Sequence, residues 1–423
     1  MYKDLSLDEL TKLEIELNKK YNNFKAKNLR LDMSRGKPCA DQLSISKDML
    51  DVINSKSNLK ASDGMDCLNY GGIDGIPECK EIFAQIFEVP SENVMVGGNS
   101  SLTLMFDYLT QCYIKGSGLD AWIKQGNVKF LCPAPGYDRH FAILEYLGIE
   151  MVNVPMTSTG PDMDVVEQLA KDSSVKGLIC VPKYSNPTGI TFSDETVKRL
   201  AAMKTADDFR IIWDNAYCIH HLLGEHDKLL NIMQECENAG NPDRVVMFAS
   251  TSKVTFPGSG VAALATSKNN IKMIKERLTI QTIGPDKLNQ LRHVRYLKDM
   301  NNIDKHMEKC AEFISPRFDV VLKALENELS SHGIASWENP NGGYFISLDV
   351  MDGCASRVYE LCKGAGVTLT NCGATYPYGK DPFDRNIRIA PTFPTIDELE
   401  KAVELLCICV KLASVEKILE LAK

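Results

Sequence analysis

The residues with the clearest chemical potential in this sequence stand just after short apolar runs. Lys253 closes the segment Ser250-Thr251-Ser252-Lys253, which follows the apolar run Val245–Ala249. A lysine at the end of a buried strand loses hydration, and this favours the neutral amine. A neutral amine is a nucleophile that can form a Schiff base. Alone, the same pattern is also typical of an exposed loop lysine, because most lysines are exposed.

Two further apolar runs end in polar residues that a hydrophobic core does not require. Asp214 and Tyr217 follow one run, and Asn186 follows another within Asn-Pro-Thr-Gly. Alone, the aspartate could cap the next segment and Asn-Pro-Thr-Gly could be a simple turn. Because ligands gather at the carboxyl ends of parallel strands, the group is more informative than its members. With Lys253, it places an amide, a carboxylate, a phenol and an amine at one sheet edge.

A phosphate site is predicted at Gly98, Asn99, Ser100 and Ser101. These residues follow a short apolar strand and precede an apolar helix. Backbone N–H groups and hydroxyls at a helix N-terminus bind phosphate well. The segment is not a P-loop, because no Gly-Lys-Ser/Thr follows. A plain serine N-cap is an equally good interpretation of the segment alone.

Pyridoxal phosphate is the cofactor that requires this combination of groups. A lysine holds it as a Schiff base, and an acidic group pairs with its pyridine nitrogen. The carboxylate of Asp214 would keep that nitrogen protonated, so that the ring accepts the electrons left at the substrate Cα. Asn186 and Tyr217 would hydrogen-bond the ring hydroxyl, and the helix N-terminus near Ser100 would take the phosphate.

The elements that must position these groups alternate between short apolar runs and helical patterns. Strands are predicted near 128–132, 149–154, 177–181, 210–213, 245–248 and 261–265. This alternation favours a mostly parallel α/β sheet with helices on both faces. After about residue 285 a long helical region, short strands and a C-terminal helix near 395–415 predict a smaller α+β domain. The N-terminal helix, which opens with a capping box at Ser6–Glu9, needs its own domain or a partner subunit to pack on.

Composition limits the class of protein. The chain has 423 residues, 44% of them hydrophobic, and a net charge of −8. It is long enough for more than one domain, and its acidic balance argues against a nucleic-acid partner. We see no signal peptide and no segment with the length of a membrane span. The 14 cysteines lack disulfide-like or zinc-like grouping, which favours a reducing cytoplasm and no metal site.

The order and spacing of these motifs resemble the fold-type I pyridoxal-phosphate-dependent aminotransferases. Asp214 of Asp-x-x-Tyr lies 28 positions after Asn186 (214 − 186), and Lys253 lies 39 positions after Asp214 (253 − 214). The segments SRGKP, GGNSSL, STSKVTFPGSGV and RIAPTFP are similar to the bacterial type Ic aspartate aminotransferases. The resemblance covers nearly the whole chain, from about Leu31 to the C-terminal helix.

The resemblance implies a large domain with a mostly parallel sheet of the seven-stranded type between helices, and a smaller α+β domain. We expect residues 1–50 to form an N-terminal arm and part of the small domain. Residues 51–300 would form the large cofactor-binding domain, and 301–423 the small C-terminal domain. The resemblance also implies a homodimer with composite active sites, in which Tyr70 reaches the phosphate bound by the neighbouring subunit.

The resemblance further implies catalytic and cofactor-binding roles for individual residues. Lys253 would form the Schiff base and move the proton at Cα, while Asp214 would pair with the pyridinium. Tyr217 and Asn186 would bind the ring hydroxyl. Tyr137 would stack on the ring. Ser250, Ser252 and the turn from Gly98 through Ser101 would hold the phosphate.

Substrate contacts are also implied by the resemblance. Arg388 would grip the α-carboxylate with its planar fork, beside Gly36 and Asn186. Arg35, Lys37 and Arg139 are unranked candidates for a second carboxylate. The sequence departs from the family in Pro257–Val261, where better-known members carry a phosphate-binding arginine. Backbone amides or Ser259 would have to substitute for it.

The implied reaction is a ping-pong amino transfer from an L-amino acid, best aspartate, to a 2-oxo acid, best 2-oxoglutarate. A transaminase for another amino acid and a β-eliminating lyase on the same scaffold are the alternative enzymes. A non-catalytic effector-binding domain of a regulator is the alternative of another class. The acidic charge and the lack of an additional N-terminal DNA-binding segment argue against that regulator.

Overall fold

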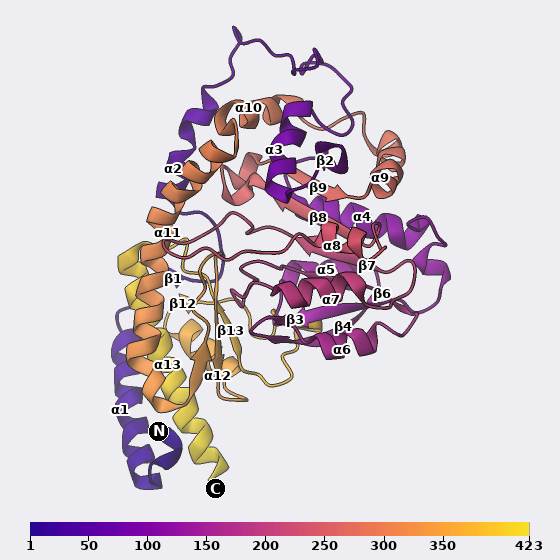
Figure 1. The fold of residues 1–423 in the computed structure, drawn as a ribbon. Coiled ribbons are helices and arrows are strands. Elements are labelled where there is room, and N and C mark those ends of the chain that lie inside the picture. Colours follow the sequence, from indigo (N-terminus) through magenta and orange to yellow (C-terminus); the bar gives the residue numbers. More distant parts are fainter. Residues whose placement is uncertain (423) are drawn as a thin grey trace.

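An eight-stranded sheet forms the centre of one lobe in the computed structural model, which describes residues 1–422 (Figure 1). In spatial order its strands are β2 (Val94–Val96), β9 (Ala262–Thr266), β8 (Val245–Ser250), β7 (Arg210–Asp214), β6 (Val175–Cys180), β3 (Lys129–Ala134), β4 (Glu150–Thr157) and β5 (Gly160–Pro161). The five strands from β8 to β4 are parallel, whereas β9 is antiparallel to both neighbours. The predicted mostly parallel sheet is confirmed, and β5 adds a two-residue strand to the seven expected.

Alternating side chains of the central strands build two cores, one on each face of this sheet. Phe130, Ile212 and Val246 belong to one cluster, whereas their neighbours Ile211 and Val245 belong to the other. Helices α4 (Ser101–Lys115), α5 (Asp138–Tyr146) and α9 (Lys268–Gln281) cover the first face. Helices α3 (Pro77–Phe87), α6 (Met163–Leu169), α7 (Asp194–Ala202) and α8 (Ile232–Asn238) contribute to the second cluster. Two buried faces explain why the strands read as continuous apolar runs.

The lobe built on the eight-stranded sheet is the large lobe; the second, the small lobe, has its own core. Its antiparallel sheet has the order β10 (Ala335–Trp337), β11 (Ile346–Val350) and β13 (Asn386–Ile389), and β1 (Leu31–Asp32) pairs in parallel with β12 (Val367–Thr368). Helices α1 (Leu7–Lys25), α12 (Ala355–Gly364) and α13 (Ile396–Leu421) pack around these strands. The predicted capping box opens α1, which packs on α13 of its own chain. Helix α13 extends beyond the predicted end near residue 415, to Leu421.

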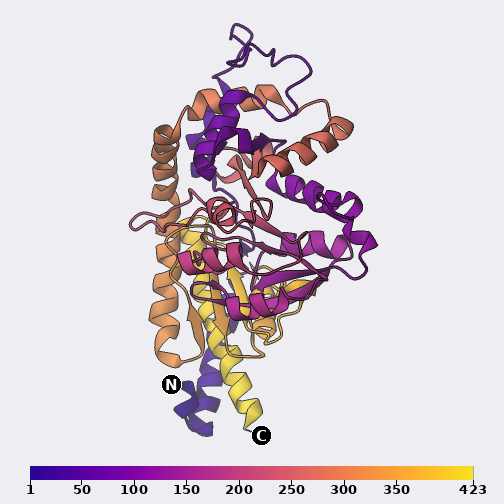
Figure 2. The same cartoon turned by 45° about the vertical axis from the view of Figure 1, so that its right-hand side comes forward.

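One long helix passes along an edge of both lobes, as Figures 1 and 2 show. Helix α10 (Lys287–Leu297) leads into α11 (Met300–Leu329), which contains Pro316. Near its start, Ile303 and Met307 pack with Val254 of the large lobe. The part of α11 from Ile314 onward belongs to the core of the small lobe. The domain boundaries at residues 50 and 300 remain predictions.

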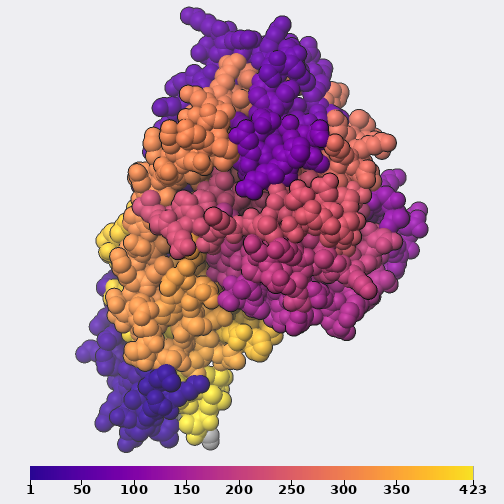
Figure 3. Space-filling model, in the orientation of Figure 1, coloured from indigo at the N-terminus to yellow at the C-terminus, as the bar shows by residue number. Residues whose placement is uncertain are grey.

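The remaining elements connect the lobes or lie at the surface. Helix α2 (Ala40–Ile45) precedes a segment, residues 51–76, that projects from the top of the molecule in Figures 1 and 3. Short 3-10 helices occupy Tyr2–Asp4, Lys47–Leu50, Ser91–Asn93, Trp122–Lys124, Thr251–Lys253, Pro257–Ser259, Ser330–His332 and Pro377–Gly379. Within residues 1–422, we find no helix with both the length and the apolar character needed to cross a membrane.

Candidate functional site

The carboxyl ends of three parallel strands bring the predicted groups together. β7 ends at Asp214, and β8 leads directly into the 3-10 turn that carries Lys253. The Nζ atom of Lys253 lies 4.8 Å from the centroid of the Tyr217 ring. Asn186 follows β6 and is buried, as are Asp214 and Tyr217. The expected amine, carboxylate, phenol and amide therefore lie at one edge of the large sheet.

The two carboxylate oxygens of Asp214 have different surroundings. Oδ2 lies 2.9 Å from Nε2 of His140. Oδ1 is buried and has no hydrogen-bond partner among residues 1–422. A buried acceptor without a donor is costly, so this oxygen fits a site for a bound group with an N–H. The sequence reasoning missed His140, although its spacing of three from Tyr137 places both on one helix face. Their rings meet edge to face at 4.9 Å between centroids.

Lys253 is held from its backbone and surrounded by aromatic rings. Its carbonyl oxygen accepts a hydrogen bond from Nε2 of Gln42 at 3.0 Å, and Gln42 also bonds the hydroxyl of Tyr344 at 2.7 Å. Burial lowers the pKa of the Lys253 ammonium, and the charge of Asp214 opposes this shift. The amine is therefore biased toward its neutral form. No sequence pattern predicted Gln42, which lies 211 positions from Lys253.

The two predicted tyrosines keep their protons at neutral pH. Burial raises the pKa of Tyr217, and the neighbouring Tyr137 and Asp214 raise it further. Burial also raises the pKa of Tyr137 to about 12, with further contributions from Asp214 and Asp138. Both phenols can therefore donate hydrogen bonds over a wide pH range.

Serine hydroxyls converge on the N-terminus of α4. Ser100 is the N-cap residue, but its side chain makes no capping hydrogen bond. Oγ of Ser252 donates to the carbonyl of Asn99 at 3.4 Å, and Oγ of Ser250 donates to Oγ of Ser252 at 3.0 Å. A Cβ built on Gly98 would meet no atom within 4 Å. Hydroxyls, helix N–H groups and open space thus meet where the phosphate was predicted.

An arginine approaches the loop that lacks one in sequence. Nη2 of Arg292, on α10, donates to Oγ of Ser259 at 3.4 Å. Nε of Arg292 is buried without a partner among residues 1–422. Asn289, one turn earlier, donates to the carbonyl oxygens of Ser259 and Gly260. A cation from another element, Arg292 of α10, therefore lies against the loop Pro257–Val261.

Arg388 reaches the same region from strand β13 of the small lobe. Its Nη1 donates to Oδ1 of Asp138 at 2.8 Å and to Oδ1 of Asn186 at 3.3 Å. Its Nε donates to Oγ1 of Thr370 at 3.3 Å. The guanidinium carbon lies 4.9 Å from the centroid of the Phe345 ring. The predicted carboxylate-binding arginine is thus buried beside Asn186, and its ion pair with Asp138 was not predicted.

The segment around Gly36 lies beside Arg388. A Cβ on Gly36 would sit 2.5 Å from Cζ of Phe345, so only glycine fits this close approach without a shift. Arg35 is exposed, and Nζ of the neighbouring Lys37 lies 3.8 Å from the ring centroid of Phe393. Because the same Phe345 ring also contacts Arg388, the segment lies close to the predicted carboxylate-binding arginine.

Two predicted residues are exposed and make no contact with the other predicted groups that the structure describes as a hydrogen bond or ion pair. Arg139 is exposed on α5. Tyr70 is 81% exposed in the projecting segment 51–76. Its place at the active site of a second subunit remains a prediction.

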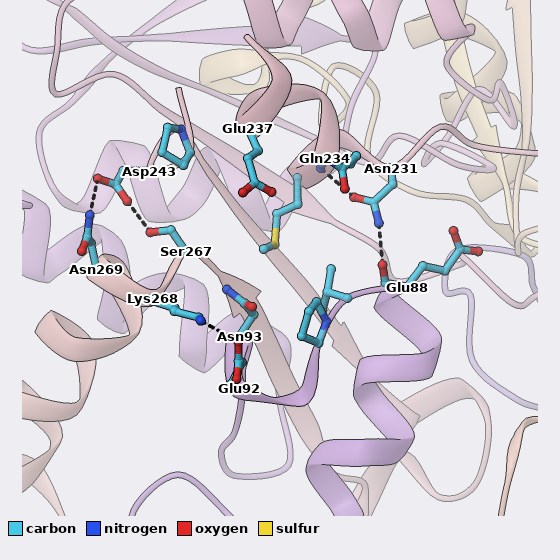
Figure 4. A pocket seen from close by; sticks show the side chains of 14 residues that line it. Glu88, Glu92, Asn93, Asn231, Gln234, Glu237, Asp243, Ser267, Lys268 and Asn269 are labelled. Carbon is cyan, nitrogen blue, oxygen red and sulfur yellow. Dashed lines mark hydrogen bonds and ion pairs between the residues drawn. The ribbon is translucent and has the colours of Figure 1, made fainter. Parts of the chain in front are cut away.

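A separate surface hollow of about 430 Å³ lies near the start of α9 (Figure 4). Its polar groups satisfy one another: Lys268 pairs with Glu92 at 2.6 Å, and Nδ2 of Asn231 donates to the carbonyl of Glu88 at 2.8 Å. None of the predicted site residues lines it. We therefore assign the candidate site to the strand ends.

The chemistry of the strand-end groups fits pyridoxal phosphate. The unpartnered Oδ1 of Asp214 suits a pyridinium N–H, and the lowered pKa of Lys253 suits a covalent link to an aldehyde. The uncommitted hydroxyl of Ser100 and the α4 N-terminus suit a phosphate. Three independent features of the site thus match three parts of one cofactor.

The chain is similar to aminotransferases along almost its whole length. The family model for aspartate amino-transferase matches residues 5–421. An aspartate aminotransferase of Corynebacterium glutamicum is 45% identical over 416 residues, which cover 98% of this chain and 96% of that protein. A crystal structure of an aspartate transaminase from Corynebacterium glutamicum matches with a TM-score of 0.96 and 45% identity, covering 98% of this chain and 99% of that chain.

A more distant structure has the same fold. The α-aminoadipate aminotransferase LysN of Thermus thermophilus, complexed with N-(5'-phosphopyridoxyl)-L-leucine, matches with a TM-score of 0.74. It is 19% identical, and the match covers 93% of this chain and 95% of that chain.

Proposed function

Because the chain belongs to the aspartate aminotransferase family, we propose that it transfers the amino group of aspartate to 2-oxoglutarate by a ping-pong mechanism. The family resemblance predicted from the motifs is confirmed, and the chain is an aminotransferase that uses pyridoxal phosphate. The observation that carries the proposed mechanism is the buried, unpartnered Oδ1 of Asp214 near a lysine of lowered pKa. Aspartate as substrate is supported by the name of the Corynebacterium relative.

The site residues would hold different parts of the cofactor. When bound, pyridoxal phosphate withdraws the electron pair left at the substrate Cα. Lys253 would hold it covalently, and Asp214 would pair with its ring nitrogen. Asn186 and Tyr217 would hydrogen-bond its ring hydroxyl, and Tyr137 would stack on the ring. The α4 N-terminus, Ser250 and Ser252 would hold the phosphate, with Arg292 as a further candidate.

Lys253 would also act as the proton carrier of the reaction. A neutral amine can take the Cα proton and return it elsewhere, and burial lowers the pKa of this group toward that state. The hydrogen bond from Gln42 fixes the backbone from which the side chain extends. Lys253 therefore combines a biased protonation state with a fixed position.

Arg388 would bind the substrate α-carboxylate. A guanidinium matches a carboxylate with two parallel hydrogen bonds, and Asn186 lies within hydrogen-bond reach of the same Nη1. The ring of Phe345 and the close approach of Gly36 limit the space beside it. For the second carboxylate of aspartate, Arg35, Lys37 and Arg139 remain candidates.

We also propose a cytoplasmic homodimer with composite sites. Near Tyr70, Leu68 is 66% exposed, and Ile283 in the adjacent segment is 63% exposed. The two segments touch, because Nζ of Lys287 donates to the carbonyl of Gly71 at 2.8 Å and Gly284 approaches the same carbonyl. An apolar surface of this kind favours association with another protein surface.

The reaction is tested by following keto-acid release from a panel of amino acids with 2-oxoglutarate as acceptor. Aspartate is expected to give the highest kcat/KM, and Lys253→Ala is expected to lower kcat by roughly 10²–10⁴-fold. Borohydride reduction followed by mass analysis should fix the cofactor to the wild type but not to Lys253→Ala. The control is Lys183→Ala, which removes a lysine that follows the neighbouring strand β6. This variant should still be linked covalently to the cofactor after reduction.

Other outcomes of this experiment separate the alternatives. Faster turnover of another amino acid would contradict aspartate as the substrate. Ammonia release from β-substituted amino acids as the main activity would identify a lyase. The absence of turnover with every substrate, in a protein that binds the cofactor, would identify an effector-binding domain.

A further inference from the structure

The ion pair between Arg388 and Asp138 joins the two lobes at the candidate site. Asp138 is the first residue of α5 in the large lobe, and Arg388 lies on β13 of the small lobe. Oδ1 of Asp138 lies 2.8 Å from Nη1 of Arg388. The arginine side chain is 8% exposed and the aspartate side chain 32%. The pair therefore has one buried partner and one partner that reaches solvent.

Asp138 uses a hydrogen-bond donor that a bidentate carboxylate would need. Nη1 of Arg388 donates to both Asp138 and Asn186, so both of its hydrogens are occupied. Nε donates to Thr370, whereas Nη2 has no hydrogen-bond partner within residues 1–422. A carboxylate that binds end-on through Nη1 and Nη2 must replace Asp138 or Asn186 at Nη1.

The charges decide which of the two partners leaves. Asn186 is neutral and can remain beside a substrate carboxylate, whereas Asp138 carries the same charge as the substrate. Within residues 1–422, Asp138 is the one acidic residue that forms an ion pair with Arg388. A buried guanidinium without a counter-ion is costly, so Asp138 stabilises Arg388 until another carboxylate replaces it.

We propose that Asp138 is an internal counter-ion that the α-carboxylate of the substrate displaces from Arg388. This inference rests on the carboxylate-binding role of Arg388 in the proposed function. The released Asp138 can turn to solvent, because its side chain is already one-third exposed. Its position in the first turn of α5 also stabilises its free charge. The exchange replaces one carboxylate by another on Arg388 and therefore lowers the affinity for every substrate carboxylate.

Calorimetric titration of the pyridoxal-phosphate-loaded enzyme with succinate tests the exchange. Succinate has two carboxylates but no amino group, so it binds without reacting. Asp138→Asn keeps the shape of the side chain and removes its charge. The expected result is a Kd for succinate that is lower by roughly tenfold, since a charge-assisted hydrogen bond no longer competes. An unchanged or higher Kd would overturn the proposal, because a purely structural Asp138 would loosen the site when altered.

Two further variants separate this proposal from the proposed function. Asp164→Asn removes a carboxylate that pairs with Arg199 on the surface at 2.6 Å, and it should leave the Kd unchanged. Arg388→Gln should abolish succinate binding. Retained binding in Arg388→Gln would contradict the role of Arg388 and the exchange together. Lost binding in Arg388→Gln with an unchanged Kd in Asp138→Asn would overturn the exchange alone. Thermal melting of each variant confirms that it is folded.

Discussion

The two carboxylate oxygens of Asp214 differ in their hydrogen-bond partners. Oδ2 is hydrogen-bonded by His140, whereas Oδ1 has no partner and, under the proposed function, would receive the ring N–H of the cofactor. We expect Asp214→Asn, which removes the charge but keeps the size, to lower kcat by roughly 10²–10³-fold. His140→Asn should lower kcat by roughly tenfold, because it removes one hydrogen bond to a charged group.

The double variant is the decisive measurement for this pair. If His140 acts only through Asp214, the double variant should be no slower than Asp214→Asn alone. Steady-state kinetics of the four proteins with aspartate gives the comparison. Multiplicative losses would assign His140 an independent role. The absorbance maximum of the bound cofactor should move in both single variants, which a loss of folding alone would not produce.

Residue types and spacing predicted which side chains meet at the strand ends, but not the residues that hold them there. Lys253, Asp214 and Tyr217 could be predicted because their motifs lie at strand ends. His140 could have been predicted from its spacing to Tyr137. The partners Gln42 and Asp138 could not, because their contacts join positions more than 200 apart in the chain.

At the scale of elements, the apolar runs predicted the strands of the large sheet except β5, but not all of their ends. β4 extends to Thr157, beyond the predicted end at residue 154, because its later side chains alternate with solvent and lack an apolar pattern. The order of the strands depends on crossovers, which local sequence does not encode. The short strands β1 and β12 could not be paired from sequence, since two residues form each of them.

The projecting segment 51–76 carries the prediction for the proposed dimer. Lys253→Ala lacks the lysine, and Tyr70→Ala lacks the tyrosine proposed to reach the other subunit. A hybrid dimer of the two variants would contain one intact site, since each site takes its lysine and its tyrosine from different subunits. Unfolding the two variants together and refolding them should therefore restore about a quarter of wild-type activity for random pairing into two-fold dimers.

The same experiment has a matched control within the chain. A mixture of Lys253→Ala and Asp214→Asn should recover no activity, because both residues belong to one subunit of each site. Failure of the first mixture to exceed its separately refolded components would contradict composite sites. Sedimentation of the wild type gives the oligomeric state independently.

At the scale of the whole molecule, buried histidines make stability depend on pH. Burial lowers the pKa of His220 to about 3 and that of His293 to about 4, whereas both titrate near 6.5 when unfolded. Below pH 6.5 the unfolded chain binds protons that the folded chain does not. The stabilisation is therefore complete above pH 6.5 and is lost as the pH falls toward 4, by up to about 1.4 kcal/mol per pH unit for each histidine.

Urea unfolding of the cofactor-free protein at pH 7 and pH 5 measures this loss. His220 and His293 together should contribute roughly 4 kcal/mol to the loss in the wild type, and His293→Asn should lose about 2 kcal/mol less than the wild type. Equal losses in the wild type and in His293→Asn would refute the assignment.

Helix α11 connects the two lobes and contains one point, Pro316, at which it can bend. Its first half is fixed to the large lobe through Ile303 and Met307, and its second half belongs to the core of the small lobe. Pro316 cannot donate to the carbonyl of Glu312, so bending is easiest there. The arm from Pro316 to Leu329 is about 20 Å long, and a bend of about 5° moves its tip by about 2 Å. A small rotation at one proline would thus displace the small-lobe core packed on this arm, relative to the large lobe, by about the length of a hydrogen bond.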